Sequence, residues 1–141
     1  MVQSLTPGET DALLERFGYC YDSLIHRIEL VLSRRGQPLD QAHIDIETRD
    51  GQESRRWGLL RLSVVDLQHY RVMQAPRKDL GVVYDGMYIG WKEDGTVRLD
   101  LLPGTDYRNG PNGNEPPSPD HESPCYFVGR ALSWDFQPYA A

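Results

Sequence analysis

Two side chains on one predicted strand could do acid–base chemistry. In the run His43-Ile44-Asp45 an imidazole and a carboxylate are two residues apart, and alternate residues of a strand point to the same face. A histidine beside a carboxylate can act as a general base or help to bind a metal ion. An ordinary solvated strand face would carry the same two residues, and we favour this second interpretation.

Carboxylates also occur in pairs on this strand, because Asp45 and Glu47 share its face and Glu29 falls on the preceding strand. Two carboxylates at a suitable separation can hydrolyse a glycosidic bond. Three arginines, Arg27, Arg49 and Arg61, are expected beside these acids on the same or neighbouring strands. Opposite charges on adjacent strands form ordinary cross-strand pairs, so we predict ion pairs here rather than a pair of catalytic acids.

No motif for a metal or a nucleophile is present. The histidines at 26, 43, 69 and 121 show neither HxxxH nor HExxH spacing, so we expect no metal and no cofactor. Cys20 and Cys125 form no CxxC pair and are predicted to be reduced, buried thiols. Cys125 follows Asp120-His121-Glu122, but nothing local would hold a cysteine–histidine pair in place. We therefore name no catalytic residue, and an enzyme is the less favoured class.

Acidic residues gather in one part of the chain. The 141 residues carry a net charge of −6. Residues 79–122 contain nine acids and three bases, which already gives −6, while the other residues contain twelve of each. An acidic chain repels phosphate backbones, so we do not expect nucleic-acid binding. A basic protein is the partner that this segment predicts.

Aromatic side chains share the acidic segment and indicate a contact surface. Tyrosine and tryptophan are enriched where proteins bind one another. The predicted partner-binding residues are Asp85, Tyr88, Trp91, Asp94, Asp100, Asp106 and Tyr107. An alternative site for a small molecule, at the mouth of a β half-barrel, combines His43, Asp45, Tyr88 and Trp91.

The elements that must position these residues are mostly strands. Thr6-Pro7-Gly8-Glu9 has the form of a capping box and predicts a helix over about 7–17, which Gly18 ends. Period-two alternation predicts strands from about 20 to 101, including one that places Leu24, Ile28, Leu30 and Leu32 on a single face. Separate strands are predicted near 60–64 and 67–74.

The rest of the chain is a long loop and a last strand. Residues 103–124 are rich in proline, glycine and asparagine, which predicts a loop, and 125–137 a final strand. We expect a single α+β domain over 1–141, mainly β: an antiparallel meander or half-barrel of about seven or eight strands with one N-terminal helix. No apolar run approaches the roughly 20 residues of a membrane helix and no signal peptide is visible, so a cytoplasmic protein is expected.

Four runs of the chain follow a shared strand pattern: RWGLLRL at 56–62, HYR at 69–71, VVYDGMYIGW at 82–91 and VRLDL at 97–101. Over about residues 20–137 this order resembles small uncharacterised bacterial β-rich proteins, some of them similar to the immunity proteins of toxin systems. The resemblance implies a protein that binds a toxin domain and blocks its active site through acidic residues. The arginines around Arg55 depart from a purely acidic interface.

Three functions follow from these observations. The first is a non-catalytic protein-binding module, with toxin immunity as its sharpest version. The second is a half-barrel that binds a small molecule and could be an enzyme. The third is a subunit that pairs with its own copy through an exposed edge strand, giving a homodimer.

Overall fold

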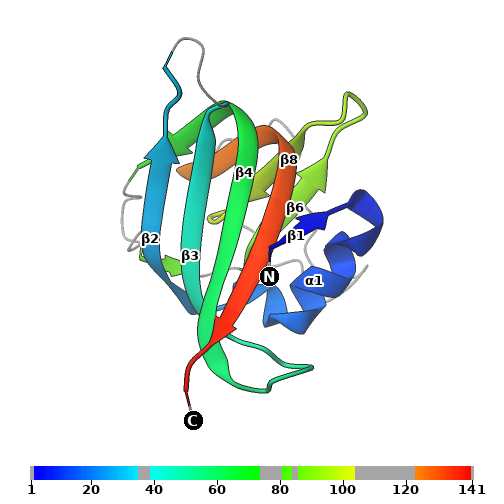
Figure 1. The fold of residues 1–141 in the computed structure, drawn as a ribbon, viewed down its shortest axis with the longest axis vertical. Helices are drawn as coiled ribbons and strands as arrows, with labels where there is room; N and C mark the ends of the chain where they lie inside the picture. The colour runs from blue at the N-terminus through cyan, green and yellow to red at the C-terminus, as the bar shows by residue number, and fades with distance from the viewer. Residues whose placement is uncertain (1, 35–38, 74–80, 84–85, 104–122, 141) are drawn as a thin grey trace.

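The computed structural model describes residues 2–34, 39–73, 81–83, 86–103 and 123–140, and within them one antiparallel sheet dominates. Its strands are β1 (Gln3–Leu5), β2 (Ser23–Val31), β3 (Gln41–Arg49), β4 (Trp57–Val72), β5 (Val82–Val83), β6 (Tyr88–Trp91), β7 (Val97–Asp100) and β8 (Cys125–Pro138). The α-helix α1 (Thr10–Arg16) lies between the 3₁₀ turns η1 (Pro7–Glu9) and η2 (Gly18–Cys20). This confirms the expected mainly β half-barrel with an N-terminal helix (Figure 1).

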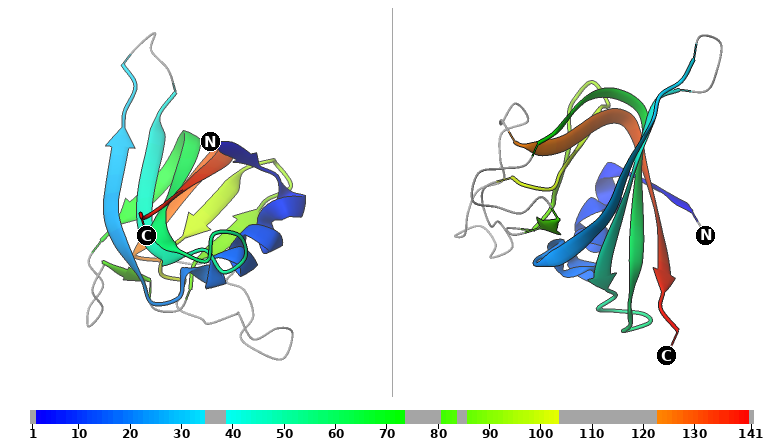
Figure 2. Two further views of the ribbon diagram at one scale, coloured as in Figure 1. Left: turned by 60° about the horizontal axis from the view of Figure 1, so that its bottom comes forward. Right: turned by 90° about the vertical axis from the view of Figure 1, so that its left-hand side faces the viewer.

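Two meanders make up the sheet, and they meet where β4 pairs with β8. The strand order is β5-β2-β3-β4-β8-β7-β6, and β1 adds to β8 from the side. Because β4 and β8 pair along most of their length and bend together, the two halves of the sheet curl toward each other (Figure 2). The edge strand β1 was not predicted from the sequence.

A β-bulge explains why β4 is longer than expected. The register with β8 shifts between Leu67 and His69, next to Asp66, whose φ is +56°. A bulge adds a residue, bends the strand and reverses the inward and outward alternation beyond it. The prediction of separate strands at 60–64 and 67–74 was therefore wrong: they are one strand, Trp57–Val72.

A second bulge corrects the predicted faces of β2. The register with β3 shifts between Ile25 and Arg27, so that Ile25 and Ile28 both lie opposite core residues of β3. Leu24, which was expected on the same face, instead points outward and is 46% exposed.

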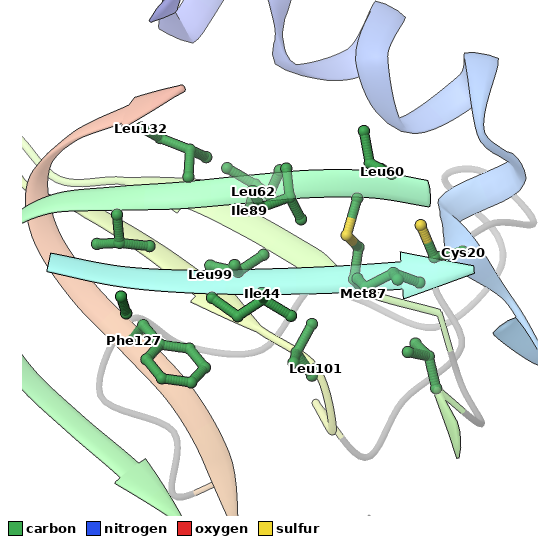
Figure 3. Close-up of a cluster of buried hydrophobic side chains, with 14 of the residues drawn as sticks. Cys20, Ile44, Leu60, Leu62, Met87, Ile89, Leu99, Leu101, Phe127 and Leu132 are labelled. Carbon is green, nitrogen blue, oxygen red and sulfur yellow. The ribbon is translucent and has the colours of Figure 1, made fainter. Parts of the chain in front are cut away.

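The core lies inside the curl. Ala42, Ile44 and Ile46 of β3 face inward beside Leu60 and Leu62 of β4. Side chains from β6, β7 and β8 complete this cluster (Figure 3). The alternation predicted for β3 is thus confirmed, and its other residues form the outer face of the sheet.

The N-terminal helix packs against the inner side of the sheet. The predicted capping box of Thr6 and Glu9 is present, but the first turn is 3₁₀, so the α-helix covers only Thr10–Arg16 rather than 7–17. Gly18 follows with the expected positive φ of +56°. Phe17 contacts the rings of Trp134 and Phe136 at centroid distances of 5.9 and 5.1 Å. These aromatic contacts attach the helix to β8.

Both cysteines are free and buried. Cys125 begins β8, whereas Cys20 lies in η2. Burial raises the pKa of each thiol to about 12, so both remain protonated and unreactive near neutral pH. Among the described residues no three His, Cys, Asp or Glu side chains are grouped as metal ligands, and no helix there has the length and apolarity to cross a membrane.

Candidate functional site

The outer face of β2, β3, β4 and β8 carries a row of alternating charges. Arg27, Asp45, Arg61 and Asp135 lie opposite one another on successive strands. Asp45 accepts hydrogen bonds of 2.7 and 3.0 Å from the Arg61 guanidinium, which lowers the pKa of Asp45. The predicted cross-strand ion pair is confirmed at Asp45–Arg61.

The alternative small-molecule site is not assembled by the four residues predicted for it. His43 lies beside Asp45 on the outer face of β3, with its Nδ1 atom 2.7 Å from the Ser63 hydroxyl oxygen. Tyr88 and Trp91 belong to β6, and β4, β8 and β7 separate β6 from β3 in the sheet. Trp91 also packs against the core, so it faces away from His43.

The predicted partner-binding residues have different surroundings. Asp85, Asp106 and Tyr107 lie outside the described residues. Asp94 is exposed in the β6–β7 turn, where hydrogen bonds from the Thr96 hydroxyl and backbone N–H lower the pKa of its carboxyl group. Tyr88 and Trp91 are half-buried, and the Trp91 indole N–H donates a 2.9 Å hydrogen bond to the Thr10 hydroxyl. Trp91 therefore connects β6 to the helix.

Asp100 is buried and is not available to a partner, contrary to the prediction. Its carboxylate accepts hydrogen bonds from the Ser123 hydroxyl at 2.7 Å, the Leu102 N–H at 3.0 Å and Arg98 at 3.2 Å. Burial raises the pKa of Asp100, while these hydrogen bonds and the Arg98 charge oppose the rise. Arg98 is also buried and lies 4.2 Å from the centre of the Tyr126 ring. This cluster joins Leu102 to Ser123; residues 104–122 of the predicted 103–124 loop lie outside the described part of the chain.

Exposed aromatic residues gather instead at the lower end of the outer face. We call this surface the Trp57 patch; its members are Tyr21, Arg49, Arg55, Arg56, Trp57 and Tyr139. Trp57 is 55% exposed, although it begins a central strand of the sheet. It lies opposite Arg49 in the β3–β4 register, and its carbonyl accepts a 2.8 Å hydrogen bond from the Tyr139 N–H. Tyr21 and Tyr139 are 39% and 38% exposed.

A cleft adjoins this patch. Its volume is about 320 Å³, and Tyr21, Arg49 and Trp57 line it together with Phe17 and Thr48. In Figures 1 and 2 no described helix or strand lies over the outer face of these strands. Tyr21 and Trp57 belong both to the exposed rings and to the lining of the cleft.

Asp50 holds the loop that carries part of the patch. Its buried carboxylate accepts two hydrogen bonds from Arg16, at 3.0 and 2.9 Å, and others from the backbone N–H groups of Gln52, Glu53 and Ser54. Burial alone would raise the pKa of Asp50, but these donors lower it well below its ordinary value. The hydrogen bonds fix residues 50–54 on the helix.

Arg55 follows this anchored segment in a constrained conformation. Its φ is +58°, a left-handed value that favours glycine. The Arg55 carbonyl accepts a 3.2 Å hydrogen bond from the Arg49 side chain, and the Arg56 carbonyl accepts one of 2.9 Å from the Asp50 N–H. Hydrogen bonds between residues 49–50 and residues 55–56 therefore close the base of the loop that carries Arg55 and Arg56.

Trp57 was not predicted as a contact residue, because the prediction was based on the acid excess of residues 79–122. The usable signal was the Asp50-Gly51 turn: a turn between strands brings the flanking residues Arg49 and Trp57 into register. We compared the chain with protein-family models, curated proteins and solved structures, and none of them matches it.

Proposed function

We propose that this chain is a non-catalytic, cytoplasmic protein-binding module and that the Trp57 patch is its contact surface. The observation that carries the proposal is the exposure of Trp57, at 55%, on an uncovered sheet face beside tyrosine and arginine. Burying an indole removes a large apolar area from contact with water. Trp, Tyr and Arg are the residues most enriched in binding hot spots. Trp57 is the residue we expect to contribute most.

The anchoring of the patch supports the same proposal. Arg16 and Asp50 fix the 50–54 loop, and β3, β4 and β8 hold Arg49, Trp57 and Tyr139 in register. A surface that is ordered before binding loses little conformational entropy when its partner arrives. Toxin immunity, implied by the resemblance of the strand pattern, is the sharpest version: the bound partner would then be a toxin domain.

The test is affinity capture from cells of the source organism, with quantitative mass spectrometry of the retained proteins. Trp57→Ala should release a specific partner and weaken its affinity by about 2 kcal/mol, roughly thirtyfold. The matched control is Tyr70→Ala, which removes a 40% exposed ring from the other end of β4. Identical retention by both variants would contradict the proposal.

A second groove favours the small-molecule alternative. It has a volume of about 310 Å³ and lies between β1, α1 and the 50–54 loop, with Gln3, Leu13, Arg16 and Trp134 among its lining residues. This is the lower end of the usual size of ligand pockets. Ala12→Trp would fill the groove from the exposed side of α1. A metabolite that raises the melting temperature of the wild type but not of this variant would establish the alternative.

A further inference from the structure

We infer that the partner segment bound by the Trp57 patch is acidic, a stretch of protein rich in aspartate and glutamate. The inference rests on the proposed function and adds the chemistry of the partner. For this surface, the partner charge is opposite to that predicted from the acid excess of residues 79–122.

Five described arginines elsewhere in the fold have carboxylate partners, whereas Arg34 and Arg71 have none among the described residues. The pairs are Arg16 with Asp50 and Glu53, Arg27 with Glu29, Arg61 with Asp45, Arg98 with Asp100 and Arg130 with Asp66. Arg27 and Arg61 belong to the same outer sheet face as Arg49. Exposure on this face therefore does not prevent an arginine from pairing within the fold.

The Trp57 patch brings three arginines without such a partner together. Within the described parts of the chain, Arg49, Arg55 and Arg56 form no ion pair with a carboxylate, although all three are exposed. Arg49 uses its Nε–H on the Arg55 carbonyl. Among the described residues, neither terminal guanidinium nitrogen of Arg49 forms a hydrogen bond. A guanidinium matches the geometry of a carboxylate with two parallel N–H donors.

The acids around the patch do not pair with its arginines. Asp50 and Glu53 accept hydrogen bonds from Arg16. Glu47 lies 3.4 Å from His26 and beside Tyr139, and Glu15 lines the cleft, but neither forms an ion pair with a patch arginine among the described residues. The three arginines are therefore a local concentration of unneutralised charge on a chain whose net charge is −6. Charge complementarity selects an anionic partner for this surface.

An acidic peptide fits the surroundings better than a nucleic acid. The adjacent rows of the outer face contain Glu47, Asp45 and Asp135. A phosphate backbone that continues along the sheet would meet these carboxylates, whereas a short acidic segment can end at the patch. The apolar face of Trp57 and the adjoining cleft suit the carbon chains of a peptide.

The experiment uses fluorescein-labelled ten-residue probes and fluorescence anisotropy at low salt. The probes are a glutamate peptide, a lysine peptide and an oligothymidylate. We expect the glutamate peptide to bind more tightly than the other two, and its affinity to fall as salt is added, because salt screens exposed charges. Tighter binding of the oligothymidylate would overturn the inference in favour of a nucleic acid, and preference for the lysine peptide would overturn it outright.

The variants locate the binding. Arg49→Gln, Arg55→Gln and Arg56→Gln together should weaken binding of the glutamate peptide at least about tenfold, as the sum of several exposed charge contacts. Arg34→Gln with Arg71→Gln is the matched control. These two arginines are also exposed and without an ion pair among the described residues, but they lie away from the patch. The control should stay within about twofold of the wild type.

The two proposals fail in different ways. If Trp57→Ala abolishes capture of the cellular partner while the triple glutamine variant binds all probes like the wild type, the patch is an interface and its acidic partner is refuted. If neither variant changes capture or probe binding, the proposed contact surface is refuted as well. Circular dichroism of each variant checks that its fold is intact.

Discussion

The Trp57 patch and the cluster of Arg98, Asp100, Ser123 and Tyr126 are built from similar residue types and are used in opposite ways. In the cluster, an arginine and an aspartate are buried together and hydrogen-bonded to each other, and the aspartate also accepts a hydrogen bond from Ser123. In the patch, three arginines lie beside an exposed indole without a carboxylate partner among the described residues. Aromatic and charged composition alone therefore does not identify a contact surface.

Burial separates the two regions energetically. A buried charge must be compensated within the fold, since an unpaired one costs several kcal/mol. An exposed charge is hydrated and can remain available for a partner. The cluster therefore contributes to stability, we propose that the patch contributes to recognition, and the following variants test this contrast.

The largest effect is expected from reversing the buried charge. Asp100→Lys would place an ammonium group beside Arg98 and remove the acceptor for Ser123 and Leu102. We expect a loss of more than about 4 kcal/mol in the free energy of unfolding, or no folded protein. Asp94→Lys, at an exposed turn, should cost far less than Asp100→Lys. Urea denaturation measures both changes in the free energy of unfolding. Equal losses for the two variants would show that the buried hydrogen bonds of Asp100 do not stabilise the fold.

The next effect concerns the loop anchor. Asp50→Asn should destabilise the protein by about 3 kcal/mol, because Arg16 loses its buried counter-charge. The lowered pKa of Asp50 means that its stabilisation is complete above the ordinary carboxyl pKa, near 3.9, and is lost as pH falls below it. The variant should thus differ most from the wild type near neutral pH and less at pH 2–3. A pH-independent difference in urea denaturation would contradict this role for the Asp50 charge.

The two tryptophans allow a smaller, direct comparison. Trp91→Ala should cost about 2–3 kcal/mol, because the ring is half-buried against the core and its N–H binds Thr10. Trp57→Ala should cost less than about 1 kcal/mol. The same denaturation experiment compares them; a Trp57 variant as unstable as the Trp91 variant would assign Trp57 to the core and not to recognition.

The smallest effect is expected from thiol reagents. Since burial raises the pKa of both Cys20 and Cys125 to about 12, neither should react with Ellman's reagent in the folded protein at pH 8. Both should react after denaturation. A thiol that reacts quickly in the native state would show that its strand or turn opens.

Local patterns determined much of this protein from the sequence. The alternation of β3, the Thr6–Glu9 capping box, the left-handed Gly18 and the Asp45–Arg61 pair were predicted correctly. Each depends on residues that are close in the chain or on directly paired strands. Such rules follow from backbone geometry, so they need no knowledge of the remaining fold.

Only the tertiary structure decided which residues are buried and which are available. Trp91 meets Thr10, 81 residues earlier, and Asp100 meets Ser123, 23 residues later, so neither burial could be inferred from neighbouring residues. The bulges at Ile25/Arg27 and Leu67/His69 shifted the faces of two strands by one residue. Because a shift of one residue exchanges core and surface, these bulges decided the face of Leu24 and of β4 beyond Asp66. Trp57 lies before the β4 bulge, in unbroken register with β3, and the tertiary structure leaves it exposed because no described helix or strand covers this face of the sheet.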